Sequence, residues 1–249
     1  MNLIGNRSKL TPTSFLVLLI VVGALVYQYY QGGLDVAQSP SKPPTVTPEL
    51  DVPTSGQPGQ FDFYVLALSW SPEYCATNGS DDPQQCSIGR KLGFVLHGLW
   101  PQYNQGYPSD CSTAKLPADV KAKFSTLYPS SNLYEHEWEK HGTCSGLTPE
   151  QYMTLAKRLK DSIGVPDSYR APEQPFRVTT TRLKQEFGTA NSNLNESSLA
   201  VYCSGSGRFL QELYVCFSLE GKPLACSSEI QSQASRSCGS PDFLVQNVR

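Results

Sequence analysis

The sequence predicts an α+β domain, a central antiparallel sheet flanked by helices and stabilised by disulfides. Strand-like alternation and helical periodicity are mixed without a regular strand–helix–strand rhythm, and no internal repeat is visible. All eight cysteines lie after residue 60, and an even cysteine count in an exported chain is typical of disulfides formed in an oxidising compartment. Residues 61–249 are therefore expected to form the folded domain, which is long enough for one hydrophobic core.

The first sixty residues differ from the rest. Residues 15–26 are continuously apolar and follow basic but no acidic residues, which predicts a signal peptide or an uncleaved signal anchor over residues 1–30. In the second case residues 15–30 provide a membrane tether. Residues 31–60 are rich in Pro, Gly, Ser, Thr and Gln, which predicts a disordered linker. Both alternatives place the domain outside the cytoplasm, as a secreted, periplasmic or membrane-anchored protein.

The first half of the domain contains two predicted strands. Residues 61–70, FDFYVLALSW, alternate and are rich in aromatic and branched side chains, so we expect a buried strand. Residues 76–89 are polar and are predicted to form a loop. Residues 91–100 form the second predicted strand, which we expect Pro101 to end.

Helices are predicted in the middle of the domain. Residues 118–127 have a helical pattern, and residues 130–132 can cap the helix that follows. The T-P-E-Q sequence at residue 148 is a capping box with proline at the first helical position, so a helix over 148–163 is expected. Residues 180–188 form another predicted helix, which its terminal glycine closes.

Near the C-terminus the sequence predicts a β-hairpin. Residues 209–219, FLQELYVCFSL, alternate like a strand, and a Gly-Lys-Pro turn follows. Residues 224–228 are expected to return as the second strand.

The segment EHEWEKHGTC, residues 135–144, contains two of the three histidines in the chain. On a helical wheel His136, Glu137, Lys140 and His141 fall within one arc of about 140°. The two other glutamates fall on the opposite side, where solvent suits them. Trp138 lies at the edge of the arc and is expected to pack.

Two alternatives to a catalytic face exist. A charged helix can simply be a solvated surface with ordinary salt bridges. A zinc site of the H-E-x-x-H type needs histidines four residues apart, whereas here Lys140 takes that position and His141 is five residues from His136. We therefore expect no metal and no other cofactor.

The third histidine, His97, lies in FVLHGLWPQ, residues 94–102. A lone histidine at a strand end is often structural, but two histidines brought together can supply a base and an acid near neutral pH. A lysine beside them suits an anion that gains charge in the transition state. A phosphodiester of RNA fits, because its 2′-OH is an internal nucleophile. The net charge of −2 excludes a protein that holds nucleic acid by charge alone.

FVLHGLWPQ and EHEWEKHGTC resemble the two active-site segments of the ribonuclease T2 family, the secreted acid endoribonucleases. The resemblance covers roughly residues 61–240 and includes FDFYVLALSWSPEYC at residues 61–75. It implies cleavage of single-stranded RNA by transphosphorylation, through a 2′,3′-cyclic phosphate to a 3′-phosphate, without metal.

The resemblance also implies a role for each matching residue. His141 would be the general base, His97 the general acid, and Glu137 and Lys140 would stabilise the transition state.

Three further residues are assigned to substrate binding. His136 would bind the phosphate. Trp100 would stack on a base, with core packing as the alternative. Asn132 would contact the base, with helix capping as the alternative.

Sequence alone leaves about a hundred cysteine pairings open. The family resemblance implies Cys75–Cys86, Cys111–Cys144, Cys203–Cys238 and Cys216–Cys226. Two positions depart from the pattern of some members, with Ser69 in place of a glutamine and Gln102 in place of an acidic residue, so base preference stays open.

Two competing functions remain: a catalytically inactive relative that binds RNA or acts in storage or signalling, and a metal-dependent hydrolase. RNA is the expected partner. Nothing in the sequence implies a protein partner or more than a monomer.

Overall fold

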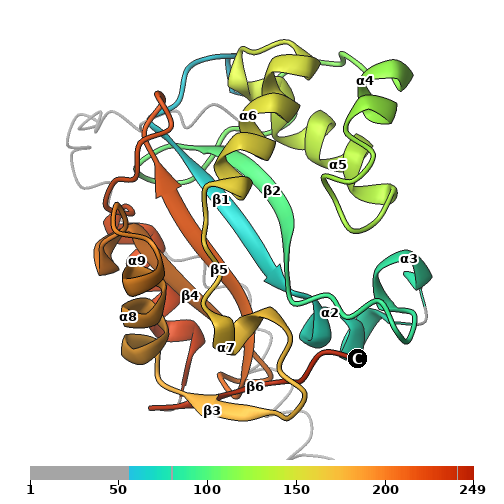
Figure 1. The fold of residues 1–249 in the computed structure, drawn as a ribbon. Helices are drawn as coiled ribbons and strands as arrows, with labels where there is room; N and C mark the ends of the chain where they lie inside the picture. The colour runs from blue at the N-terminus through green and yellow to red at the C-terminus, as the bar shows by residue number, and fades with distance from the viewer. Residues whose placement is uncertain (1–55, 80, 240) are drawn as a thin grey trace, which may run out of the picture. The chain divides into compact units, whose positions relative to one another are not determined.

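The computed structural model describes residues 56–79, 81–239 and 241–249, and a six-stranded sheet forms its centre (Figure 1). The strand order is β2-β1-β5-β6-β3, and β4 pairs with β5. The pairing is antiparallel except between β5 and β6, which are parallel. The predicted α+β class is confirmed, with one parallel contact in the sheet. The strands are β1 Phe63–Trp70, β2 Phe94–Gln102, β3 Phe176–Val178, β4 Leu199–Ser204, β5 Phe209–Phe217 and β6 Phe243–Val245.

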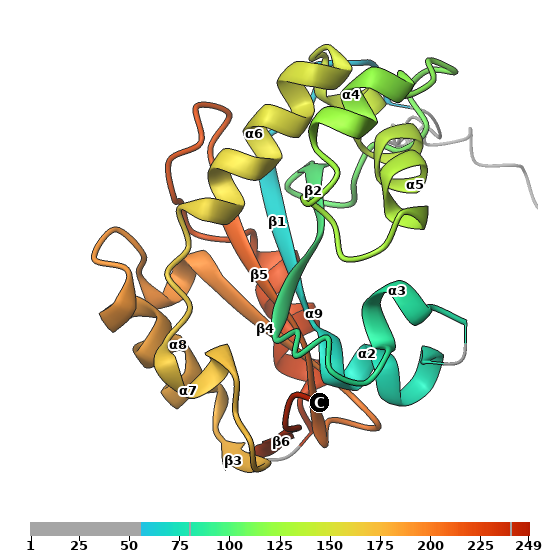
Figure 2. The same cartoon turned by 45° about the vertical axis from the view of Figure 1, so that its right-hand side comes forward.

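Helices cover both faces of this sheet (Figures 1 and 2). Alternate residues of β1 point to opposite sides: Leu66 and Leu68 join the larger core beneath α4 to α8, while Val65 and Ala67 join a smaller core beneath α9. The helices are α2 Ser71–Asn78, α3 Pro83–Cys86, α4 Ala118–Lys123, α5 Asn132–Lys140, α6 Pro149–Asp161, α7 Asp167–Arg170, α8 Thr180–Ala190 and α9 Ser228–Ser237, with 3-10 turns at Gly142–Ser145 and Glu196–Ser198.

All four disulfides implied by the family resemblance are present. They are Cys75–Cys86, Cys111–Cys144, Cys203–Cys238 and Cys216–Cys226. The second of them joins the loop after β2 to the 3-10 turn after α5, so it ties together the two segments that carry the histidines.

Several predicted helix boundaries differ from the structure. The predicted loop 76–89 contains the end of α2 and the short helix α3, which Asp82 caps by accepting a hydrogen bond from the Gln85 backbone N–H. Helices of this length show no readable periodicity. The helix predicted to close at Gly188 continues to Ala190, because the side chain of Asn191 donates to the Phe187 carbonyl and ends it there.

Two strand predictions also need correction. Pro101 does not end β2, which continues to Gln102; β2 is an edge strand, where proline is tolerated. The returning strand predicted at 224–228 is absent, and the hairpin has only one bridge, between Phe217 and Pro223 of the predicted turn. The chain leaves the sheet there because Ser227 caps α9.

The apolar segment 15–26 and most of the linker lie outside the described residues. Residues 56–60, which were assigned to the linker, contact the domain: the Gly59 N–H donates to the Cys144 carbonyl at 2.9 Å. A side chain at Gly56 would collide with Pro108. Within the described ranges no helix is both long enough and apolar enough to cross a membrane.

Candidate active site

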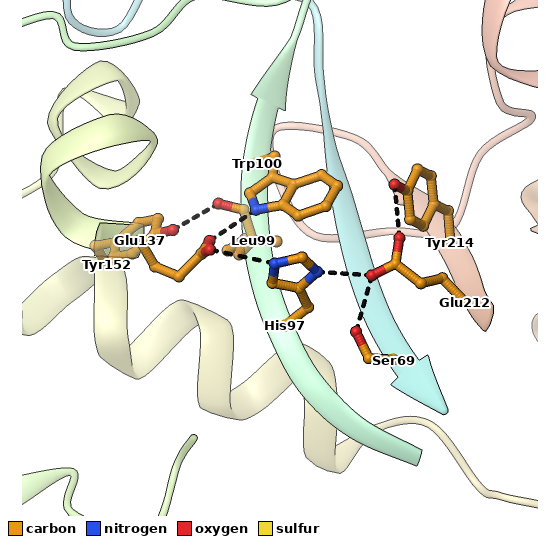
Figure 3. Close-up of polar contacts among 8 residues, drawn as sticks. All are labelled: Ser69, His97, Leu99, Trp100, Glu137, Tyr152, Glu212 and Tyr214. Atoms are coloured by element: carbon orange, nitrogen blue, oxygen red, sulfur yellow. Dashed lines mark hydrogen bonds and ion pairs between the residues drawn. The ribbon is translucent and has the colours of Figure 1, made fainter. Parts of the chain in front are cut away.

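An irregularity in β2 places His97. Gly98 pairs with Ala67 of β1 and Leu96 pairs with Leu68, so His97 is an extra residue in the ladder, a β-bulge. The bulge lies next to a point where α6 holds β2, because the Tyr152 hydroxyl donates to the Leu99 carbonyl at 2.6 Å (Figure 3). The bulge re-aims the imidazole out of the regular alternation and toward two carboxylates.

The imidazole of His97 lies between those two carboxylates (Figure 3). Nδ1 is 2.6 Å from Oε1 of Glu212, on β5, and Nε2 is 3.7 Å from Oε1 of Glu137, on α5. Burial lowers the pKa of His97, but the hydrogen bond and charge of Glu212, with the charge of Glu137, outweigh burial and raise it. His97 is therefore protonated under mildly acidic conditions.

Glu137 is fully buried, and α5 delivers it to the site. Its Oε2 accepts a hydrogen bond of 2.7 Å from Trp100 Nε1, while Oε1 has no hydrogen-bond partner among the described residues. Burial raises the pKa of Glu137 to about 7, against the opposing effects of His97, Trp100 and Lys140. Below that pH the side chain is a neutral carboxylic acid that can donate a hydrogen bond.

His141 lies immediately after α5, and its backbone N–H still donates to the Glu137 carbonyl. Its ring lies between the ring of Trp100, with centroids 5.2 Å apart, and that of Tyr107, at 6.1 Å. Burial, followed by the charge of Lys140, lowers the pKa of His141 to about 3. His141 is thus neutral, and able to accept a proton, over the range in which His97 is protonated.

Lys140 and His136 complete the predicted face of α5. His136 is exposed, and partial desolvation followed by the charge of Lys140 lowers its pKa. The Lys140 carbonyl accepts from the Asp110 N–H at 2.9 Å, so the disulfide-bonded loop docks directly on this end of the helix. Trp138 of the same helix is buried, and its Nε1 donates to the Ala114 carbonyl, which confirms its predicted packing role.

The two remaining predicted residues, Trp100 and Asn132, have different surroundings in the structure. Trp100 is half-buried and packs against His97, His141 and Tyr214, so it belongs to the scaffold of the site as well as to its surface. Asn132 is exposed at the start of α5. The helix cap before it is Ser131, which makes no side-chain capping bond.

A pocket of about 320 Å³ adjoins His97. Its lining includes Ser69, Glu212, Pro129 and Leu133, but not Asn132. In the described part of the chain no group of three or more His, Cys, Asp or Glu side chains is arranged to hold a metal ion.

Two residues of the site were missed in the sequence. Glu212 interrupts the apolar pattern of β5 yet is buried, and a carboxylate in an otherwise buried strand was the signal that could have revealed it. Tyr107 is 52% exposed beside His141; it lies in a loop with no periodicity, so the sequence carried no signal for it.

The site brings together two histidines whose surroundings shift their pKa values in opposite directions, beside two buried carboxyl side chains. The chain belongs to the ribonuclease T2 family, whose sequence model matches residues 61–226. A ribonuclease of Aeromonas hydrophila is 44% identical over 203 residues, which are 80% of this chain and 91% of that protein.

Solved structures of ribonucleases share the fold. Ribonuclease MC1 from bitter gourd seeds is 21% identical, with a TM-score of 0.57, over 74% of this chain and 99% of that one. A mutant of RNase MC1 in complex with 5′-UMP is 20% identical, with a TM-score of 0.56, over 74% of this chain and 97% of that one. The protein is therefore a ribonuclease, as the sequence predicted.

Proposed function

We propose that this ribonuclease cleaves single-stranded RNA internally by transphosphorylation, through a 2′,3′-cyclic phosphate to 3′-phosphate products, without a metal ion. One observation carries the proposal: the environments of His97 and His141 move their pKa values in opposite directions within one site. Titratable groups whose environments separate their pKa values mark the acid and the base.

In the first step neutral His141 takes the proton of the 2′-OH, and the 2′-oxygen bonds to phosphorus. The bond from phosphorus to the 5′-oxygen breaks, and His97 gives that oxygen its Nε2 proton. Glu137 donates to the phosphorane from Oε1, which has no hydrogen-bond partner among the described residues, and Lys140 offsets the charge of the phosphorane. A neutral donor suits this place better than a carboxylate, which would repel the anion.

In the second step water opens the cyclic phosphate. The two histidines exchange roles: His97, now neutral, takes a proton from water, and protonated His141 returns one to the 2′-oxygen. The products are a 3′-phosphate and a free 2′-OH.

Substrate binding relies on few charges, consistent with the net charge of −2. His136 binds a phosphate of the substrate beside Lys140. The exposed ring of Tyr107 and the outer face of Trp100 offer stacking surfaces that only unpaired bases can reach. Asn132 does not line the pocket beside His97. Its contact with the base stays a prediction from the sequence.

The four disulfides support an oxidising, extracytoplasmic compartment for this enzyme. We infer that it acts there as an exported enzyme.

The test compares RNA with a DNA of the same sequence at about pH 5 in EDTA, using the disulfide-bonded wild type, His97→Ala and His141→Ala. Glu220→Gln, an exposed carboxylate outside the site, serves as the control. We expect 2′,3′-cyclic phosphate ends from RNA, intact DNA, two inactive histidine variants and a fully active control. Activity only with added metal would support the metal-dependent hydrolase, and a folded wild type that binds RNA without cleavage would support the inactive relative.

A further inference from the structure

We infer that Glu212 is a positioning residue that holds His97 in the orientation and tautomer of a general acid. This inference rests on the proposed function, in which His97 protonates the leaving 5′-oxygen.

Glu212 is buried, with 8% of the residue exposed. Oε1 accepts from Ser69 Oγ at 2.8 Å and lies 2.6 Å from His97 Nδ1, while Oε2 accepts from the Tyr214 hydroxyl at 2.9 Å (Figure 3). Burial raises the pKa of Glu212, but the bonds to His97, Ser69 and Tyr214 outweigh burial and lower it. Glu212 is therefore a fixed anion on the inner side of His97.

The sheet register explains why this contact forms. Ser69 of β1 pairs directly with Glu212 of β5. The bulge on the other side of β1 frees His97 from the ladder, so its side chain can reach across β1. Ser69, at a position where some family members carry glutamine, thus supports the carboxylate.

The consequence for catalysis follows from the two ring nitrogens. Because an ionised carboxylate only accepts hydrogen bonds, Nδ1 must carry a proton. Nε2 then faces Glu137 Oε1 at 3.7 Å, on the side of the catalytic groups, and is the nitrogen that gives its proton to the 5′-oxygen. The same arrangement orients histidine in hydrolase triads, where a buried carboxylate fixes the tautomer and stabilises the imidazolium.

Other charges also act on His97, so the effect of Glu212 must be separated from theirs. Glu137 raises the pKa of His97, and Lys140 lowers it, both from α5. His97 also interacts electrostatically with His136 and His141. A simple structural ion pair would contribute to stability without selecting a nitrogen or a reaction step.

The first measurement needs no substrate. The chain has three histidines, so a proton NMR titration of their C2–H signals can be assigned with His97→Ala. In Glu212→Gln, whose amide keeps the size but loses the charge, the pKa of His97 should fall below that of the wild type. Ser69→Ala and Tyr214→Phe, which each remove one hydrogen bond to the carboxylate but keep its charge, should change the pKa of His97 by less than Glu212→Gln does.

The second measurement separates the general acid from the general base. A dinucleotide releases a poor leaving group that needs a proton, whereas a ribonucleoside 3′-(4-nitrophenyl phosphate) releases an anion that does not. Glu212→Gln should lower kcat on the dinucleotide by at least about tenfold, with little change in KM, and move the alkaline limb of the pH profile to lower pH. On the aryl ester its kcat should stay close to that of the wild type.

The control variants fix the interpretation. His97→Ala should show the same selectivity for the leaving group, and His141→Ala should lose activity on both substrates. Glu220→Gln should change neither the titration nor the rates, and Glu212→Asp should recover part of the activity. An unchanged His97 titration, or equal losses on both substrates, would overturn the role of Glu212. No cleavage of either substrate by the wild type would instead overturn the proposed function, and the titration would still report on the pairing.

Discussion

The absence of a side chain at Gly98 is what permits the hydrogen bond between Trp100 and Glu137. A Cβ at this position would lie 2.0 Å from Glu137 Oε2 and 2.1 Å from Trp100 Nε1. Non-bonded heavy atoms need about 3.5 Å, so in Gly98→Ala both groups must move by roughly 1 Å or more. Their 2.7 Å hydrogen bond then breaks.

The size of the effect follows from burial. A lost hydrogen bond to a buried charged or ionisable group costs about 1.5–3 kcal/mol, and a misplacement of about 1 Å in a catalytic group costs about a hundredfold in rate. We expect Gly98→Ala to lower kcat/KM on RNA about a hundredfold and to lower the free energy of unfolding by about 2 kcal/mol.

Initial rates on RNA and urea unfolding measure the two quantities. Gly188→Ala is the matched control, because a Cβ there meets nothing closer than 3.7 Å and the residue lies inside α8. It should keep full activity and gain up to about 1 kcal/mol of stability. Wild-type activity in Gly98→Ala would refute the reasoning, since the carboxylate would then work without its place beside Trp100.

Three further predictions concern the same site. Glu137 has a pKa of about 7 in the fold and about 4.3 in an unfolded chain. The stability that the fold gains by keeping Glu137 protonated is therefore fully present below about pH 4.3 and is lost as pH rises through 7. At pH 8.5 the free energy of unfolding of Glu137→Gln, measured with urea, should therefore exceed that of the wild type by roughly 3–4 kcal/mol, with no such gain at pH 4. An equal difference at both pH values would contradict burial as the cause. Replacing Cys111 and Cys144 together by alanine removes the link between the two catalytic segments, at roughly 3–4 kcal/mol for 33 residues of separation. Activity on RNA should fall while far-UV circular dichroism stays native, and full activity would show that the link is not needed. Tyr107→Ala should raise KM several-fold through the loss of about 1 kcal/mol or more of stacking and leave kcat nearly unchanged, whereas Tyr107→Phe should behave like the wild type; a loss confined to kcat would place Tyr107 in the chemistry instead.

Local sequence patterns predicted the elements with strong periodicity. The strand at 61–70, the helix carrying EHEWEKHGTC and the capping box at Thr148 are all present. Short elements such as α3, and strands of three residues such as β3 and β6, were missed because three or four residues are too few to show a periodic pattern. Their positions depend on what they pack against.

The sequence by itself determined the chemistry available: the histidines, the carboxylate and the lysine on one helical face follow from a period of 3.6 residues, and the two motifs identify the family. The tertiary structure decided which groups meet and in which protonation state. His97 reaches Glu212 across 115 positions of sequence because the register of β1 with β2 and β5 sets both the bulge and the pairing, and register is a property of the assembled sheet. Burial, which no local pattern reports, then lowers the pKa of His141 and raises that of Glu137. In both groups burial disfavours the charged form.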